Sequence, residues 1–204
     1  WSDYLRGMMM IWQACAFKVR AFEAAISGDV PQGAGLSSSA AYEVAVGTLV
    51  NEMMATGISP KQLATLAQKA ENRFIGVQCG IMDQFISAMG RADAALLLDC
   101  RTLASRPVPL RLAERGLAIV IIHSGVQRGL VDSQYNDRRL ECTAAVTYLA
   151  KKLKRDDVKA LRDVTLAELK KAEKGMPELP LKRARHVISE NERVLEAVEA
   201  LGKG

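Results

Sequence analysis

Residues 28–54, GDVPQGAGLSSSAAYEVAVGTLVNEMM, constrain the fold of this chain more than any other segment. A glycine-rich turn leads through three consecutive serines, Ser37 to Ser39, into a segment whose apolar residues recur at spacings of three and four. This spacing predicts a helix from Ser37 to about Ala55, with Gly57 just past its end. The expected apolar stripe of this helix consists of Ala41, Val44, Ala45, Leu49 and Met53.

Three kinds of site place glycines before a helix. A P-loop is excluded, because it needs a lysine after its last glycine and no lysine occurs between positions 19 and 60. A dinucleotide-binding turn is disfavoured, because Ser38 stands where the third glycine belongs and no acidic residue closes a second strand further on. A general anion site remains, in which Gly33 and Gly35 let the backbone approach a phosphate at the positive end of the helix. A serine N-cap after a tight turn is the plainer alternative.

The rest of the chain divides into a mixed part and a helical part. In the mixed part we expect helices at 1–16, from Pro60 past Ala70, and after Gly80, with Ser59 as the cap of the second. We expect strands at 17–27, 94–100 and 117–123. After Ser124 the pattern predicts helices alone, at 132–154, 165–174 and 181–201, with a capping box of Thr165 and Glu168. The sequence thus predicts two domains, 1–124 and 125–204.

Composition excludes several classes of protein. No apolar run approaches the roughly 20 residues of a membrane span, and the first 20 residues lack the layout of a signal peptide. The net charge of +5 arises largely where lysines interleave with acidic residues, which indicates a solvated face rather than a nucleic-acid groove. The four cysteines form no CxxC pair, so we expect reduced thiols, a cytoplasmic location and no zinc site.

Two carboxylates stand out before any family is considered. Asp83 lies in the first turn of the helix after Gly80, where the helix end favours its ionised form and suits it to accept a proton, although acidic residues are common in first turns. Glu71 borders the apolar stripe of its helix, so it must reach solvent, pair or bind a cation. Lys69 and Arg73 stand at the wrong spacing to pair with it.

Tyr135 lies where the mixed part meets the helical part. Its ring could stack on a sugar and its hydroxyl could donate a hydrogen bond, but half-buried packing is the more common role of a lone tyrosine. His123 and His186 have no partner at a metal-binding spacing.

Four separated segments carry a resemblance to a known family. PQGAGLSSSAA resembles the second motif of the GHMP kinase superfamily, and GDVPQGAGLSSSAAYEVAVGTLV, AENRFIGVQCGIMDQFISAMG, ALLLDCRTL and VDSQYNDRRLEC together resemble galactokinases in sequence and in order. The resemblance implies an α+β fold of two domains: a mixed α/β N-terminal part, residues 1–124, with the phosphate loop, and a largely helical part of the C-terminal domain, residues 125–204.

The same resemblance implies a function, ATP-dependent phosphorylation of the C1 hydroxyl of galactose with Mg²⁺. It assigns ATP binding to Gln32, Gly33, Ala34, Gly35, Leu36, Ser37 and Ser38, the Mg²⁺ ligands to Ser39 and Glu71, the catalytic base to Asp83, and galactose contacts to Asp83 and Tyr135. Expected partners are the small molecules galactose and ATP, with no nucleic acid and no membrane, and the full-length protein is expected to be a monomer.

Two other family motifs do not occur in this sequence. One resembles GRVNLIGEHTDY and supplies an arginine and sugar contacts, and the other is a glycine-rich motif like GGGFGG. We therefore expect the 204 residues to be the central portion of a longer protein, with negligible turnover when isolated and a tendency to associate. Two alternatives stay open: a galactokinase-like sensor in transcriptional control, and a sister enzyme such as an N-acetylgalactosamine kinase. Intact Ser37 to Ser39 and Asp83 favour an enzyme.

Overall fold

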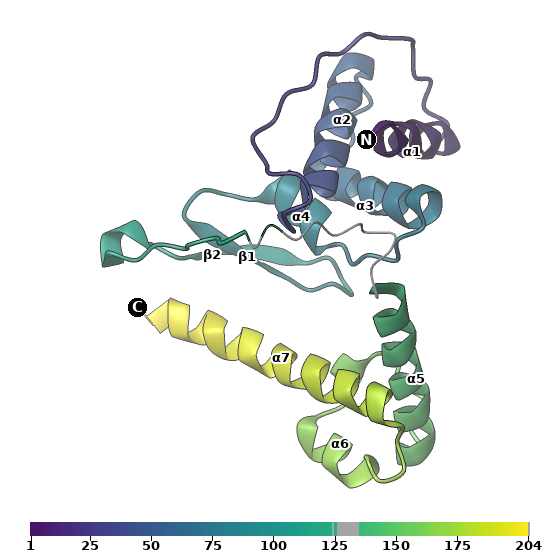
Figure 1. Cartoon of the computed structure of the whole chain (residues 1–204), viewed down its shortest axis with the longest axis vertical. Helices are drawn as coiled ribbons and strands as arrows, with labels where there is room; N and C mark the ends of the chain where they lie inside the picture. The colour runs from purple at the N-terminus through teal and green to yellow at the C-terminus, as the bar shows by residue number, and fades with distance from the viewer. Residues whose placement is uncertain (124, 126–134, 204) are drawn as a thin grey trace. The chain divides into compact units, whose positions relative to one another are not determined.

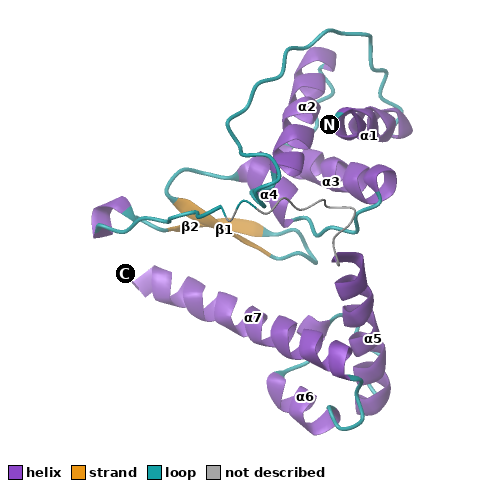
Figure 2. Cartoon of the chain, viewed as in Figure 1, coloured by secondary structure: helices purple, strands orange, loops and turns teal. Residues whose placement is uncertain are grey.

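The computed structural model describes residues 1–123, 125 and 135–203, and these form two compact units, Trp1–Ser133 and Gln134–Gly204. The first unit combines helices with a small sheet and the second is helical (Figures 1 and 2), which is the predicted α+β class. The units separate nine residues after the boundary that the sequence predicts at Ser124.

The first unit is built on three packed helices, α1 (Ser2–Ala14), α2 (Ser38–Met54) and α3 (Pro60–Ala70). Met8 and Trp12 of α1, Val50 of α2, and Leu63 and Ala67 of α3 are buried together in its main core. Ser59 begins α3 as predicted, since its hydroxyl accepts from the Gln62 backbone N–H while the Gln62 side chain accepts from the Ser59 N–H. A π-helical turn, η1 (Glu71–Ile75), continues α3 and ends at Gly76.

A short helix and a hairpin complete the first unit. Helix α4 (Met82–Met89) packs on α2 and α3, with Phe85 fully buried against Ala64 and Ile81. Strands β1 (Ala94–Leu98) and β2 (Ser105–Pro109) pair antiparallel, Ala94 opposite Pro109 and Leu98 opposite Ser105, and the 3₁₀ turn η2 (Ala113–Arg115) follows. Strand β1 was predicted and β2 was not. Two prolines in β2 reduce its strand signal, and they are tolerated because proline can lie at the edge of a sheet.

Two strand predictions are wrong. Residues 17–27 and 117–123 contain no strand, and the hairpin β1–β2 is the sheet that the described residues form. Their composition fits a strand, but a strand needs a neighbour to pair with, and neither segment has one among the residues described. As a result, apolar side chains such as Ile26 and Ile122 are exposed.

The predicted apolar stripe of α2 is also largely wrong. Of its five residues only Val44 is buried, whereas Ala45, Leu49 and Met53 are exposed. The face of α2 that packs on α1, α3 and α4 consists of Ala40, Glu43, Val44, Val46, Gly47 and Val50. A helix with apolar residues on several sides does not reveal its buried face by spacing alone, and here that face includes a carboxylate.

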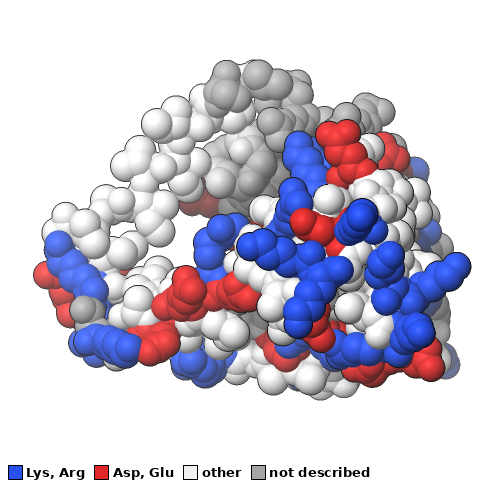
Figure 3. Space-filling model, turned by 90° about the horizontal axis from the view of Figure 1, so that it is seen from below, with Lys and Arg blue, Asp and Glu red and all other residues white. Residues whose placement is uncertain are grey.

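The second unit is a small helical domain. It consists of α5 (Tyr135–Leu153), the 3₁₀ turn η3 (Leu161–Asp163), α6 (Leu166–Ala172) and α7 (Glu178–Lys203), close to the predicted ranges, and the Thr165–Glu168 capping box is present. Leu149, Leu169 and Ile188 lie in its core, and Arg183 of α7 pairs with Glu141 of α5 at 2.5 Å. On the face seen in Figure 3, acidic and basic side chains are interspersed.

Candidate active site

The glycine loop adopts a backbone that only its glycines accommodate easily. Gly33 and Gly35 have φ angles of +68° and +73°, in the left-handed region, and a Cβ added to either would meet no atom within 4 Å. Glycine is therefore favoured at these two positions because of their backbone conformation, and not because a side chain would clash with a neighbour. The residues from Gln32 to Ser38 are exposed or half-buried, so a ligand can reach the loop.

Helix α2 begins directly after this loop without a side-chain cap. Ser37 is its N-cap residue, in the left-handed conformation with φ 58° and ψ 36°, and its side chain makes no capping hydrogen bond. The first N–H groups of a helix have no partner within the helix, and they carry partial positive charge. The loop and the helix start together therefore offer hydrogen-bond donors to an anion. The plainer interpretation, a serine that caps its own helix, does not describe Ser37.

Ser39 and Glu71 lie side by side. Ser39 Oγ donates to Glu71 Oε1 at 3.3 Å, which joins the first turn of α2 to the π turn that follows α3. Glu71 is only 3% exposed, deeper than its position at the border of the predicted stripe indicated. Because an unpaired buried carboxylate is costly, its burial depends on the donors around it.

Those donors come from residues that the sequence analysis did not single out. Gln84 Nε2 of α4 donates to Glu71 Oε2 at 2.5 Å and lies 3.3 Å from Glu43 Oε2 of α2, while Cys79 Sγ lies 3.3 Å from Glu71 Oε2. Glu43 and Gln84 are both 0% exposed. Burial, and then the charge of Glu71, raise the pKa of Glu43 to about 8, and the same two causes raise that of Cys79 to about 12.

The apolar periodicity of the sequence does not reveal Glu43. It stands four residues before Gly47, and both belong to the buried face of α2. Periodicity counts only apolar residues, so it overlooks a carboxylate on such a face.

Asp83 lies in the first turn of α4, as predicted. It is half-buried, and its carboxylate makes no hydrogen bond or ion pair with the described residues. Its neighbour Gln84 is buried and contacts Glu43 and Glu71, so α4 is anchored by Gln84 while the preceding Asp83 stays partly exposed. Tyr135 belongs to the second unit, as the first residue of α5, and is 42% exposed.

The oxygen donors present suit a hard cation. Within the described part of the chain, no three His, Cys, Asp or Glu side chains come together as a metal cluster. Ser39 and Glu71 offer one hydroxyl and one carboxylate, a set that fits Mg²⁺, which keeps several waters and takes few protein ligands. Glu71 Oε1 accepts from Ser39, whereas Oε2 is held by Gln84 and Cys79, so Oε1 is the oxygen available to a cation.

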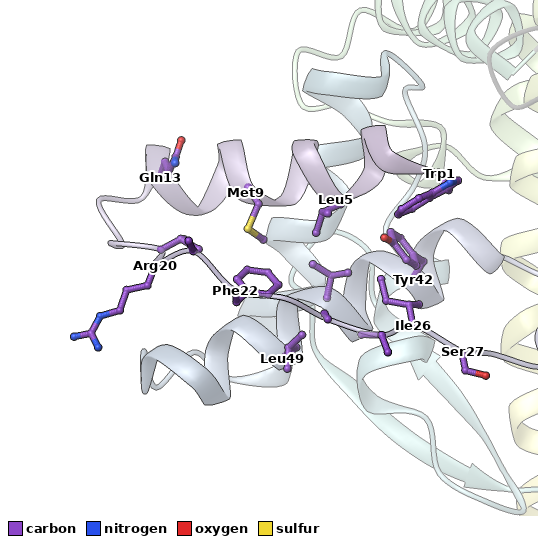
Figure 4. Close-up of a pocket in the computed structure, with 16 residues that line it drawn as sticks. Trp1, Leu5, Met9, Gln13, Arg20, Phe22, Ile26, Ser27, Tyr42 and Leu49 are labelled. Carbon is purple, nitrogen blue, oxygen red and sulfur yellow. The ribbon is translucent and has the colours of Figure 1, made fainter.

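A separate apolar cavity of about 580 Å³ lies between α1, α2 and the segment 19–27. Figure 4 shows Leu5 and Met9 of α1, Phe22 and Ile26 of the segment, and Leu49 of α2 around it. None of the predicted site residues lines this cavity, and its walls carry few polar groups. We therefore place the candidate site at the loop and not here. Each helix in the described part of the chain is too short or too polar to span a bilayer.

Two comparisons with known proteins find matches to this chain. Residues 4–91 match the model of the GHMP kinase N-terminal domain, a range that contains the loop, Ser39, Glu71 and Asp83. Among solved structures, the chain matches Lactococcus lactis galactokinase, determined in complex with galactose, with a TM-score of 0.82 and 30% sequence identity. The match covers 100% of this chain and 52% of that one, so the chain spans about half the length of the solved galactokinase. This chain is therefore similar to GHMP kinases over residues 4–91 and to a solved galactokinase along its whole length.

Proposed function

We propose that the full-length protein transfers the γ-phosphoryl group of ATP to the C1 hydroxyl of galactose and yields galactose 1-phosphate. The observation that carries this proposal is the uncapped start of α2, with Ser39 of its first turn 3.3 Å from the buried Glu71. A phosphate-binding backbone next to a Mg²⁺-suited pair of oxygens is what phosphoryl transfer requires. The similarity to a galactokinase solved with galactose supports the sugar.

Each part of the site then has a role. Residues Gln32 to Ser38 would hold the phosphates of ATP through backbone N–H groups and hydroxyls, where the two positive φ angles let the chain approach closely. Ser39 and Glu71 would hold Mg²⁺, which when bound neutralises charge on the phosphates. Tyr135 would contact galactose. The two compact units would be parts of the N-terminal and C-terminal GHMP kinase domains.

Asp83 would orient the C1 hydroxyl and accept its proton. A general base must have its oxygens free to meet the substrate, and the Asp83 carboxylate has no partner among the described residues.

The test uses the full-length gene product, since the chain spans only 52% of the solved galactokinase. ADP release is measured with galactose, N-acetylgalactosamine and glucose as acceptors, and galactose should give the highest kcat/KM. Asp83→Asn should abolish ADP release while the Kd for ATP changes little. A preference for N-acetylgalactosamine would reassign the substrate, and binding of ATP and galactose without ADP release would indicate a sensor. Substantial turnover by Asp83→Asn would remove Asp83 from the proposed role.

A further inference from the structure

Glu71, Gln84 and Glu43 form a buried polar cluster with Gln84 in the middle. Gln84 lies between two glutamate side chains and its Nε2 meets one oxygen of each, Glu71 Oε2 at 2.5 Å and Glu43 Oε2 at 3.3 Å. All three side chains are at most 3% exposed, and they come from α4, η1 and α2. Burying two carboxyl groups and an amide in a small core is costly, so a purely structural core would favour apolar residues here.

The orientation of the Gln84 amide depends on its donors alone. Gln84 Oε1 is buried and has no hydrogen-bond partner, as does Glu43 Oε1. An amide carries two N–H donors on one side and a carbonyl on the other. With Glu43 in place, both acceptors draw the N–H side. Without Glu43, one N–H loses its acceptor and Glu71 alone holds the amide, so the amide is fixed less firmly.

The two oxygens of Glu71 are thereby given different surroundings. Gln84 and Cys79 lie at Oε2, and Ser39 lies at Oε1. Because Gln84 and Cys79 hold Oε2, the Glu71 carboxylate cannot rotate freely, and Oε1 stays directed at Ser39. Hydrogen bonds that orient a metal-ligating carboxylate in this way commonly affect metal affinity by about 10- to 100-fold.

We propose that Glu43 is a positioning residue that acts through Gln84 to hold Glu71 Oε1 toward Ser39 for a divalent cation. This inference rests on the proposed role of Ser39 and Glu71 as the Mg²⁺ ligands. It assigns a function to a fully buried residue outside the proposed ATP, metal and sugar contacts.

The experiment measures metal binding rather than turnover. Binding of Mn²⁺ to the full-length protein with a non-hydrolysable ATP analogue is followed by electron paramagnetic resonance, and binding of the analogue alone is measured in EDTA. Glu43→Leu should weaken Mn²⁺ binding by about tenfold and leave metal-free analogue binding within about twofold. Glu43→Gln, which keeps a carbonyl acceptor for Gln84, should recover most of the affinity. Glu52→Leu, the same change at an exposed position of α2, is the matched control and should bind Mn²⁺ as wild type.

The double variant Glu43→Leu/Glu71→Gln separates positioning from packing. If Glu43 acts through Glu71, its loss should weaken Mn²⁺ binding no further once Glu71 is changed. An equal loss in both backgrounds, or unchanged Mn²⁺ affinity in Glu43→Leu, would overturn the inference. Should Glu43→Leu fail to fold, Gln84→Met removes the same link and must give the same pattern.

Mn²⁺ and analogue binding by wild type and Glu71→Gln show whether the proposed role of Glu43 fails alone or together with the proposed function. If Glu71→Gln leaves Mn²⁺ affinity unchanged, or if wild type binds no analogue, the proposed function fails and this inference falls with it. If Glu71→Gln weakens Mn²⁺ binding and neither Glu43→Leu nor Gln84→Met does, this inference alone fails.

Discussion

Ser39 Oγ donates to Glu71 Oε1 at 3.3 Å, although the two residues are 32 positions apart in the sequence. The contact exists because the first turn of α2 and the π turn after α3 meet where these helices pack. A hydroxyl and a carboxylate fixed at this distance form a ready pair of oxygen ligands for a small hard cation. The position of this pair at the start of α2 joins the proposed metal site to the proposed phosphate site.

Ser39→Ala and Glu71→Gln should both raise the Mg²⁺ concentration that half-saturates ATP binding in the full-length protein. The effect of Glu71→Gln should be the larger, because it removes a negative charge as well as a ligand. Isothermal titration with ATP at a series of Mg²⁺ concentrations measures this dependence. Thr65→Ala is the control, since Thr65 is half-buried on α3 and, among the described residues, its hydroxyl bonds only to the Lys61 carbonyl. Equal Mg²⁺ dependence in wild type and Glu71→Gln would contradict the metal site.

The free energy of unfolding should fall as pH rises from about 5 to about 8 because of Glu43. Its pKa rises from 4.5 to about 8 on folding, so in this range the native state keeps a proton that the unfolded chain has lost. Stability from this group is thus complete below pH 4.5 and is lost as pH approaches 8. The charged or titratable groups around it are Glu71, Cys79 and Tyr4, and the pKa of Tyr4 is also raised, by burial and then by the two glutamates.

Glu43→Gln isolates this contribution, because its amide resembles the protonated acid and does not titrate. Urea denaturation at pH 5.5 and 8 should show a smaller loss of stability in the variant than in wild type, and other titrating groups cancel in the comparison. Parallel stability curves for the two proteins would show that Glu43 is already ionised in the native state at neutral pH.

Local signals in the sequence predicted much of the fold. The caps at Ser59 and Thr165 are confirmed, because a capping box needs only residues three apart. The strands at 17–27 and 117–123 failed, because alternation describes a strand's faces and cannot supply the partner that it pairs with. In the site, the glycines and Glu71 carry signals of their own, whereas Glu43 and Gln84 become meaningful only when α2 and α4 pack together.

Gly47→Ala should destabilise the first unit by about 1–2 kcal/mol. A Cβ at Gly47 would lie 2.3 Å from Leu63 Cδ1 and 2.8 Å from Met8 Cε, and both of those side chains are buried, so they have little room to move. The better helix propensity of alanine offsets part of this cost. Gly202→Ala is the matched control, since a Cβ there meets nothing within 4 Å, and it should be neutral or slightly stabilising. Thermal unfolding of both variants measures the difference, and equal melting temperatures would show that α1 and α3 adjust freely around Gly47.

The exposed apolar segment 119–122 should make the 204-residue chain associate. Ile119, Val120, Ile121 and Ile122 are 71, 76, 64 and 88% exposed, and four consecutive β-branched or aliphatic residues without charge favour pairing with another chain. Ile121→Lys places a charge in the middle of this segment and should reduce association, with little effect on stability because the side chain contributes little to the core. Asn191→Lys adds the same charge at an exposed position of α7 and should leave association as in wild type. Sedimentation velocity over a range of protein concentrations distinguishes the two, and a chain that stays monomeric throughout, or one that Asn191→Lys disperses equally well, would assign no association to this segment.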